Sequence, residues 1–127
     1  MNDSLLILVI EDSDRIRKML ADALESGGFH AMEARTAMEG VRLARARRPD
    51  VIVVDLGLPD QDGGVTISCL KDYEGFETIP VVLISGMSEE ELRGRAMEMG
   101  AVSFLRKPFA PRVLLDCVKQ ITARDVG

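Results

Sequence analysis

The sequence is poor in thiol and imidazole groups, with two cysteines and one histidine among 127 residues. Cys69 and Cys117 lie in separate helical patterns without the spacing of a metal site, so we expect two reduced thiols packed in the protein. A redox role is the less favoured alternative. His30 begins a weak strand pattern away from the strand ends, which favours a structural or surface role over catalysis.

Long apolar segments are also lacking. The apolar run Leu5–Ile10 is far too short to span a bilayer, and it lacks the cationic leader of a signal peptide. We therefore expect a cytoplasmic protein that makes no membrane contact.

Positive charge is in deficit, because the formal net charge is −5 and the pI is about 4.9. Proteins that grip nucleic-acid phosphates usually carry a basic surface, so direct nucleic-acid contact is not expected. A basic partner or a bound cation is favoured instead. One basic cluster closes a predicted helix, where cations suit the helix dipole, and we interpret it as a solvated helix end: Arg42, Arg45, Arg47 and Arg48.

The length and composition suit one globular domain over residues 1–127, with 46% apolar residues and enough chain for a hydrophobic core. No repeat, low-complexity segment or linker indicates a second domain. Short apolar runs that predict strands alternate with amphipathic patterns that predict helices. The expected strands span residues 5–10, 29–34, 51–55, 79–85 and 101–105, and a helix is expected after each.

Capping signals mark several of these helices. Thr36 with Glu39 and Ser88 with Glu91 have the spacing of capping boxes, and Gly100 is placed to end the fourth helix. The third helix is expected to carry Val65, Cys69 and Leu70 on its apolar face. Strands that alternate with helices predict an α/β fold, a doubly wound five-stranded parallel sheet with helices on both faces.

The expected strand ends carry polar residues. Asp55 closes the strand of the run VIVVDLGLPDQDG, where an unpaired carboxylate would be costly. In a doubly wound sheet, function lies in the crevice beyond the carboxyl ends of the strands. The first strand ends in Glu11-Asp12, the fourth in Ser85-Gly86 and the fifth in Arg106-Lys107-Pro108.

These strand ends predict a cation site. Crowded carboxylates repel one another unless a cation lies among them, and oxygen ligands suit a hard ion such as Mg²⁺. Taken singly, an aspartate after a strand is more often a turn former or a helix cap, and a lysine before proline is more often a solvated loop residue. The functional interpretation is favoured because the residues arrive together at successive strand ends.

The sequence resembles the receiver domains of two-component response regulators, the CheY-like superfamily, over essentially its whole length. The resemblance is carried by the motifs ILVIEDS, VIVVDLGLPDQDG, VVLISG and FLRKPF. It implies a flavodoxin-like strand order of 2-1-3-4-5. It also implies a signalling domain, not an enzyme in the ordinary sense, that catalyses its own phosphorylation and dephosphorylation with Mg²⁺.

The resemblance implies a role for each matching residue. Asp55 would be the phosphoacceptor and, with Asp12 and the carbonyl of Gly57, a direct Mg²⁺ ligand, while Glu11 would act through water. Ser85 would bond a phosphoryl oxygen and Lys107 would pair with the phosphoryl group. Ser85 and Phe104 would form the switch, and the Lys107-Pro108 peptide bond would be cis.

Two residues depart from the commonest family pattern, since Ser85 replaces a frequent threonine and Phe104 a frequent tyrosine. Phenylalanine has no hydroxyl to bond, so its signal would depend on packing alone. The resemblance implies a sensor histidine kinase or a histidine phosphotransfer protein as phosphodonor. The expected output partner is an unknown protein or an output domain outside this sequence, and a second copy of the chain is also possible. It would bind the surface of the fourth helix, fifth strand and fifth helix, where apolar contacts are expected from Leu92, Met97, Phe109 and Val113.

Two alternatives compete with this hypothesis. A pseudo-receiver would be a protein-binding module without the chemistry, but it usually lacks the acidic pair, the aspartate or the lysine, and all are present here. A phosphatase with an aspartyl nucleophile would need a second acid two residues later, where Gly57 stands.

Overall fold

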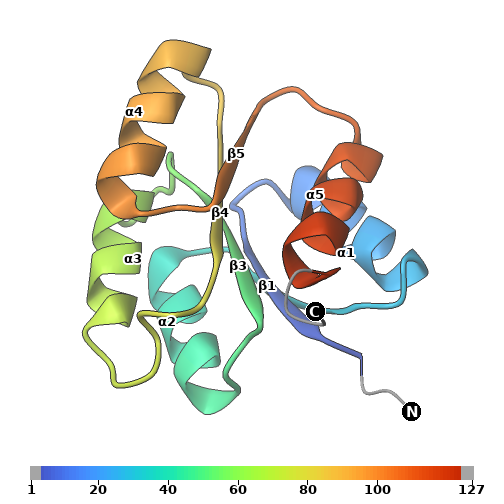
Figure 1. Ribbon diagram of the computed structural model, residues 1–127, viewed down its shortest axis with the longest axis horizontal. Helices are drawn as coiled ribbons and strands as arrows, with labels where there is room; N and C mark the ends of the chain where they lie inside the picture. The colour runs from blue at the N-terminus through green and yellow to red at the C-terminus, as the bar shows by residue number, and fades with distance from the viewer. Residues whose placement is uncertain (1–3, 124–127) are drawn as a thin grey trace.

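The computed structural model describes residues 4–123. Their five strands form one parallel sheet in the order β2-β1-β3-β4-β5. Each strand is followed by a helix, which confirms the predicted fold class (Figure 1). The elements in chain order are β1 (Leu6–Ile10), α1 (Asp14–Ser26), β2 (His30–Ala34), α2 (Ala37–Ala46), β3 (Val51–Asp55), α3 (Gly63–Lys71), β4 (Val81–Ser85), α4 (Glu89–Met99), β5 (Ser103–Arg106) and α5 (Pro111–Ala123).

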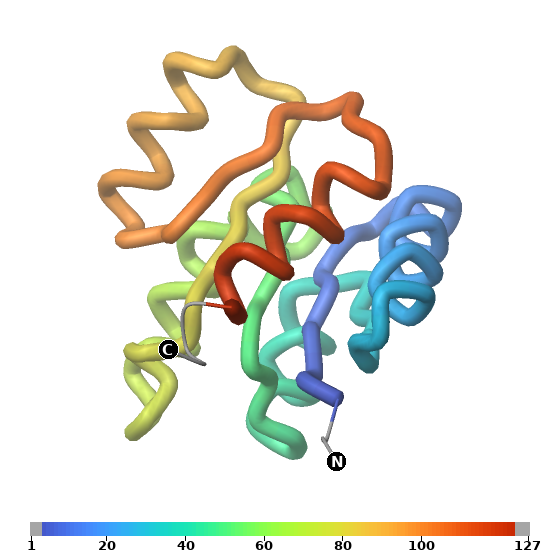
Figure 2. The backbone as a smooth tube through the Cα atoms, turned by 45° about the vertical axis from the view of Figure 1, so that its right-hand side comes forward, coloured from blue at the N-terminus to red at the C-terminus, as the bar shows by residue number. Residues whose placement is uncertain are grey.

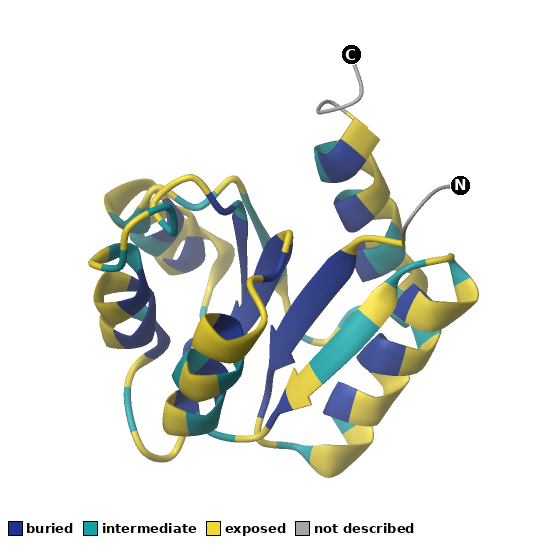
Figure 3. Cartoon of the chain, turned by 90° about the horizontal axis from the view of Figure 1, so that it is seen from below, coloured by how far each residue is buried: buried dark blue, intermediate teal, exposed yellow. Residues whose placement is uncertain are grey.

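Helices cover both faces of the sheet. The helices α1 and α5 pack on one face, and α2, α3 and α4 pack on the other, as Figures 1 and 2 show. Alternate residues of each central strand belong to the two core clusters; on β1, for example, Leu8 faces α2 and Val9 faces α1. The strands β1, β3 and β4 are buried along their whole length, as Figure 3 shows, which explains their unbroken apolar runs.

The helix starts follow the predicted capping signals, with small differences. Ser88 accepts a hydrogen bond from the Glu91 N–H at 3.2 Å and donates one to the Glu91 side chain at 3.0 Å. Thr36 accepts from the Glu39 N–H at 3.1 Å, but the Glu39 carboxylate reaches past it to the Arg35 N–H at 2.8 Å. Gly100 ends α4 in the left-handed conformation, with φ of 69°.

The predicted apolar face of α3 is partly wrong. The residues that face the sheet are Gly63, Thr66, Ile67 and Leu70, whereas Val65 is 51% exposed and Cys69 is exposed. The reason is the close approach of Gly63 to β3, which sets the rotation of the helix and leaves positions 65 and 69 on the outer side. Cys69 is therefore not packed as predicted, while Cys117 is half-buried; both are free thiols.

Within residues 4–123, none of the helices combines the length and the apolar character that a membrane span requires.

Candidate functional site

The polar residues predicted at the strand ends meet at one edge of the sheet, at the top of Figure 1. The ammonium of Lys107 lies 3.0 Å from Asp55 Oδ2 and 2.7 Å from Glu11 Oε1. Carboxylate oxygens of Glu11, Asp12 and Asp55 lie within 4.8 Å of one another. Residues that are up to 96 positions apart in the chain thus form one cluster because parallel strands end at the same edge.

Asp55 is held at the end of β3 by both of its carboxylate oxygens. Oδ1 accepts the Gly57 N–H at 3.0 Å and Oδ2 accepts from the Lys107 ammonium. The first turn of α3 lies directly against this strand end. A Cβ atom on Gly63 would lie 2.8 Å from the Asp55 carbonyl oxygen and 3.0 Å from Leu56 Cα, so only glycine allows this approach.

Glu11 is fully buried and shares the lysine with Asp55. Its Oε2 accepts the Ser13 N–H at 3.0 Å. Its Oε1 forms an ion pair with the Lys107 ammonium, but the two groups are not aligned for a hydrogen bond. Burial raises the pKa of the Glu11 carboxyl above its usual value, although Lys107 and the Ser13 N–H oppose this. Burial alone would lower the pKa of Lys107, but Glu11 and Asp55 outweigh it and raise that pKa. Lys107 is therefore a firmly protonated cation between two carboxylates.

The cluster fits a hard divalent cation. Asp12 is exposed, whereas Glu11 and Asp55 are buried, so the group opens to solvent on the Asp12 side. Carboxylate oxygens are the ligands that Mg²⁺ prefers, and an open side leaves room for the waters that it retains. The contact that Glu11 makes with Lys107 differs from the water-mediated metal contact predicted for it, which stays a prediction.

Ser85 and Phe104, which are predicted to form the switch, lie on the other side of Asp55. Ser85 is buried at the end of β4, its Oγ accepts the Met87 N–H at 3.2 Å, and its carbonyl accepts the Lys107 N–H at 2.7 Å. The Lys107-Pro108 peptide bond is cis. Phe104 is half-buried against the core cluster beneath α4, and the Arg93 guanidinium carbon lies 5.7 Å from its ring centroid.

Sequence reasoning missed one buried residue at the site. Arg17 of α1 is 8% exposed and donates to the Glu11 carbonyl at 2.9 Å, to Asp14 at 2.6 Å and to Glu33 at 3.3 Å. It therefore fixes the backbone immediately before Asp12. Its burial could have been predicted from the sequence, because residues 17, 20, 21 and 24 have helical spacing and form the buried face of α1.

The apolar residues predicted for the surface of α4, β5 and α5 are partly wrong. Leu92 is fully buried, since it packs into the core, and Phe109 packs against the cluster under α1 and α5. Met97 and Val113 are exposed as predicted, and Val102 adds a third exposed apolar side chain.

The sequence model of the response regulator receiver domain matches residues 7–119. The chain belongs to this family. The receiver domain is 41% identical over 103 residues to the KDP operon transcriptional regulatory protein KdpE of Escherichia coli, which covers 81% of this chain and 44% of that protein. The chain spans about half the length of the curated relatives it matches.

Solved structures support the same fold. A putative response regulator from Chloroflexus aurantiacus gives a TM-score of 0.88 at 26% identity, covering 95% of this receiver domain and 99% of that chain. The signal receiver domain of a signal transduction histidine kinase from Syntrophus aciditrophicus gives a TM-score of 0.84 at 33% identity, covering 94% and 91%. The predicted strand order and the receiver fold are thereby confirmed.

Proposed function

We propose that this receiver domain is a phosphorylation-dependent switch that accepts a phosphoryl group on Asp55 in a Mg²⁺-dependent reaction. The observation that carries the proposal is the Asp55 carboxylate at the end of β3, 3.0 Å from the Lys107 ammonium and within one acidic cluster with Glu11 and Asp12. Phosphoryl transfer depends mainly on positioning and charge neutralisation, and this arrangement supplies both.

The proposed reaction is a single displacement at phosphorus. A carboxylate oxygen of Asp55 forms the new bond to phosphorus while the bond from phosphorus to the donor's histidine nitrogen breaks, and the electron pair stays on that nitrogen. A sensor histidine kinase or a histidine phosphotransfer protein is the proposed donor, and a small acyl phosphate can replace it. Water later hydrolyses the aspartyl phosphate.

The neighbouring residues prepare Asp55 for this reaction. Asp12, Asp55 and the carbonyl of Gly57 would hold Mg²⁺ directly and Glu11 through water, and the ion would neutralise charge on the phosphoryl oxygens. The Lys107 ammonium donates to Asp55 Oδ2 at 3.0 Å, which places a positive charge beside the reacting side chain. The Gly57 N–H fixes the second carboxylate oxygen, so the side chain has a defined orientation before the donor arrives.

The signal leaves the site through Ser85, Lys107 and Phe104. A phosphoryl group adds charge and acceptor oxygens, which Ser85 and Lys107 would contact after the loop between β4 and α4 moves inward. Phe104 would then adopt a more buried position. The surface of α4, β5 and α5, with exposed Met97, Val102 and Val113, would change its affinity for an output partner or for a second copy of the chain.

The phosphoacceptor is tested by treating the purified domain with acetyl phosphate and Mg²⁺ and measuring its intact mass. We expect one phosphoryl addition, which is lost in Asp55→Asn and on chelation of Mg²⁺. Asp72→Asn is the matched control, because Asp72 is an exposed aspartate at the end of α3.

Stoichiometric labelling that persists in Asp55→Asn would move the phosphoacceptor elsewhere. No labelling of the wild-type domain by acetyl phosphate or by a phosphohistidine donor would favour the pseudo-receiver, a binding module without the chemistry.

A further inference from the structure

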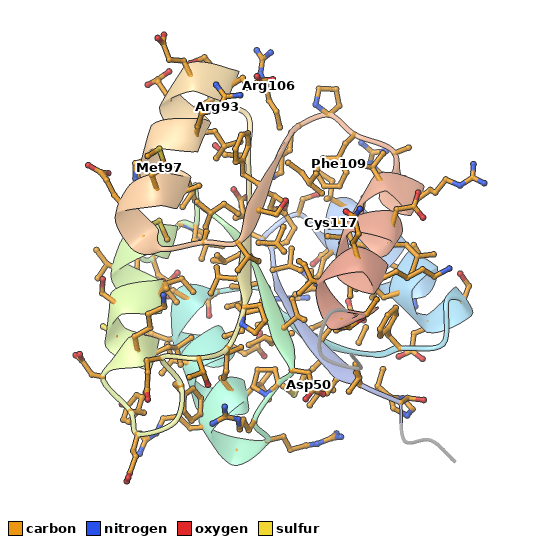
Figure 4. All side chains as sticks on the ribbon, viewed as in Figure 1. Asp50, Arg93, Met97, Arg106, Phe109 and Cys117 are labelled. Atoms are coloured by element: carbon orange, nitrogen blue, oxygen red, sulfur yellow. The ribbon has the colours of Figure 1, made fainter. Side chains whose placement is uncertain are left out.

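Two arginines bridge the edge strand β5 and the start of α4. Arg106, the last residue of β5, donates from Nε to the carbonyl oxygen of Met87 at 3.2 Å. Arg93 of α4 lies over the ring of Phe104 and pairs with Glu89 at 2.8 Å. Figure 4 shows Arg93 and Arg106 at the same end of the molecule, one from α4 and the other from β5.

Met87 is therefore held through both of its backbone polar groups. Its N–H donates to Ser85 Oγ at 3.2 Å and its carbonyl accepts from Arg106. The residue belongs to the loop between β4 and α4, which directly follows Ser85, the residue whose hydroxyl is proposed to contact the phosphoryl group. Any inward movement of this loop must break or remake the contact with Arg106.

Phe104 and Arg106 occupy the same face of β5, because side chains two residues apart on a strand point the same way. The ring packs against the core under α4, and the Arg93 guanidinium covers its outer side. Phe104 was predicted to signal by packing alone, since it lacks a hydroxyl. The structure also places a charged neighbour beside the ring, the Arg93 guanidinium, in a cation–π arrangement.

We propose that Arg106 is a positioning residue that holds the loop between β4 and α4 in its unphosphorylated arrangement, with Arg93 covering Phe104 in the same state. The inference rests on the proposed function and adds a restraint to it. Without a phosphoryl group the Arg106 contact stabilises the resting loop, and it opposes the movement that brings Ser85 to the phosphoryl oxygens. Loss of the contact shifts the population towards the phosphorylated arrangement, because a restraint present in one state biases the equilibrium against the other.

The test compares wild type, Arg106→Ala and Arg112→Ala. Arg112 is an exposed arginine in the first turn of α5, so the control makes the same change in charge and size at another exposed site. Beryllofluoride with Mg²⁺ serves as the phosphoryl mimic, and its affinity is measured by amide chemical shifts in NMR titrations. We expect Arg106→Ala to bind the mimic about fivefold more tightly, which corresponds to ~1 kcal/mol, and Arg112→Ala to match wild type.

The sign of the change separates positioning from general damage, because a variant that merely loses stability would bind the mimic more weakly or equally. Wild-type affinity in Arg106→Ala, or weaker binding, would overturn the inference while leaving phosphorylation at Asp55 intact.

A second measurement needs no phosphoryl mimic. Hydrogen exchange of the Met87 amide in the free protein should be severalfold faster in Arg106→Ala than in the control variant, because the loop loses one of its two backbone anchors. Unchanged exchange at Met87 would overturn the inference even if wild type failed to bind beryllofluoride, whereas that failure itself would count against the proposed function.

Discussion

The two sides of Asp55 are held in place by different kinds of contact. On the β1 side, Glu11 is fully buried and Arg17 is 8% exposed, and the arginine donates to the Glu11 carbonyl. On the β4–β5 side, the buried Ser85 accepts the Met87 N–H, but the arginine contacts come from exposed side chains, namely Arg106 with the Met87 carbonyl and Arg93 with Glu89.

The difference indicates that the two sides of the site have different mechanical roles. Buried polar contacts are costly to break because the separated groups remain away from water, whereas exposed contacts are replaced by water at little cost. The β1 side is thus suited to holding the acidic residues in a fixed geometry. The β4–β5 side is suited to two arrangements that differ little in free energy.

The largest expected effect tests the β1 side. Arg17→Met should lower the free energy of unfolding by about 2 kcal/mol, because it leaves the buried Glu11 carbonyl without this donor. The exposed Arg15→Met should change stability by less than about 0.5 kcal/mol. Urea unfolding of the two variants makes the measurement, and equal stabilities would remove the contrast between the two sides.

An intermediate effect tests the β4–β5 side through the N-cap of α4. Ser88→Ala removes the N-cap of α4 and should cost about 1 kcal/mol, and Thr36→Ala should cost about the same at α2. Only Ser88→Ala should also shift the NMR signals of the Phe104 ring, since Phe104 packs beneath α4. The contrast fails if both variants shift the ring signals or if neither does.

The smallest expected effect is a change in how the free energy of unfolding depends on pH, and it tests Glu11 on the β1 side. Burial raises the pKa of Glu11 above its usual 4.5, so the folded protein holds this proton more tightly than the unfolded chain does. The contribution of Glu11 to stability is therefore greatest below pH 4.5 and is lost as the pH rises through the raised pKa.

Glutamine does not titrate, so the stability of wild type relative to Glu11→Gln should fall as the pH rises. Unfolding in urea across this range, in buffer without divalent cations, measures the difference. A difference that stays constant or grows with pH would show that burial does not control this carboxyl.

The sequence predicted most of the fold and the members of the site, for physical reasons. Continuous apolar runs mark strands buried on both faces, and parallel strands bring their carboxyl ends to one edge of the sheet. The sequence alone therefore groups the site residues Glu11, Asp12, Asp55, Ser85 and Lys107. Boundaries were less accurate; the fourth strand, expected from residue 79, begins at Val81.

The contacts between side chains were not predictable in the same way. Glu11 was expected to act through a metal-bound water, and its closest charged neighbour is Lys107. Arg106 and Met87 are 19 residues apart in the chain, and the local pattern of apolar residues does not predict which carbonyl an exposed arginine contacts. Such contacts depend on the rotation of each helix and the twist of the sheet, which only the assembled fold sets.

The close approach at Gly63 limits which sequences this fold can accept. Alanine is the better helix former by about 1 kcal/mol, yet its methyl group would press on the Asp55 carbonyl and the Leu56 backbone, neither of which can rotate away. A saturation library at position 63, selected for folding, should therefore return glycine alone. The neighbouring position 64 faces flexible side-chain ends of Arg95 and Asp62 and should accept other residues, so tolerance to substitution should change abruptly between two adjacent glycines.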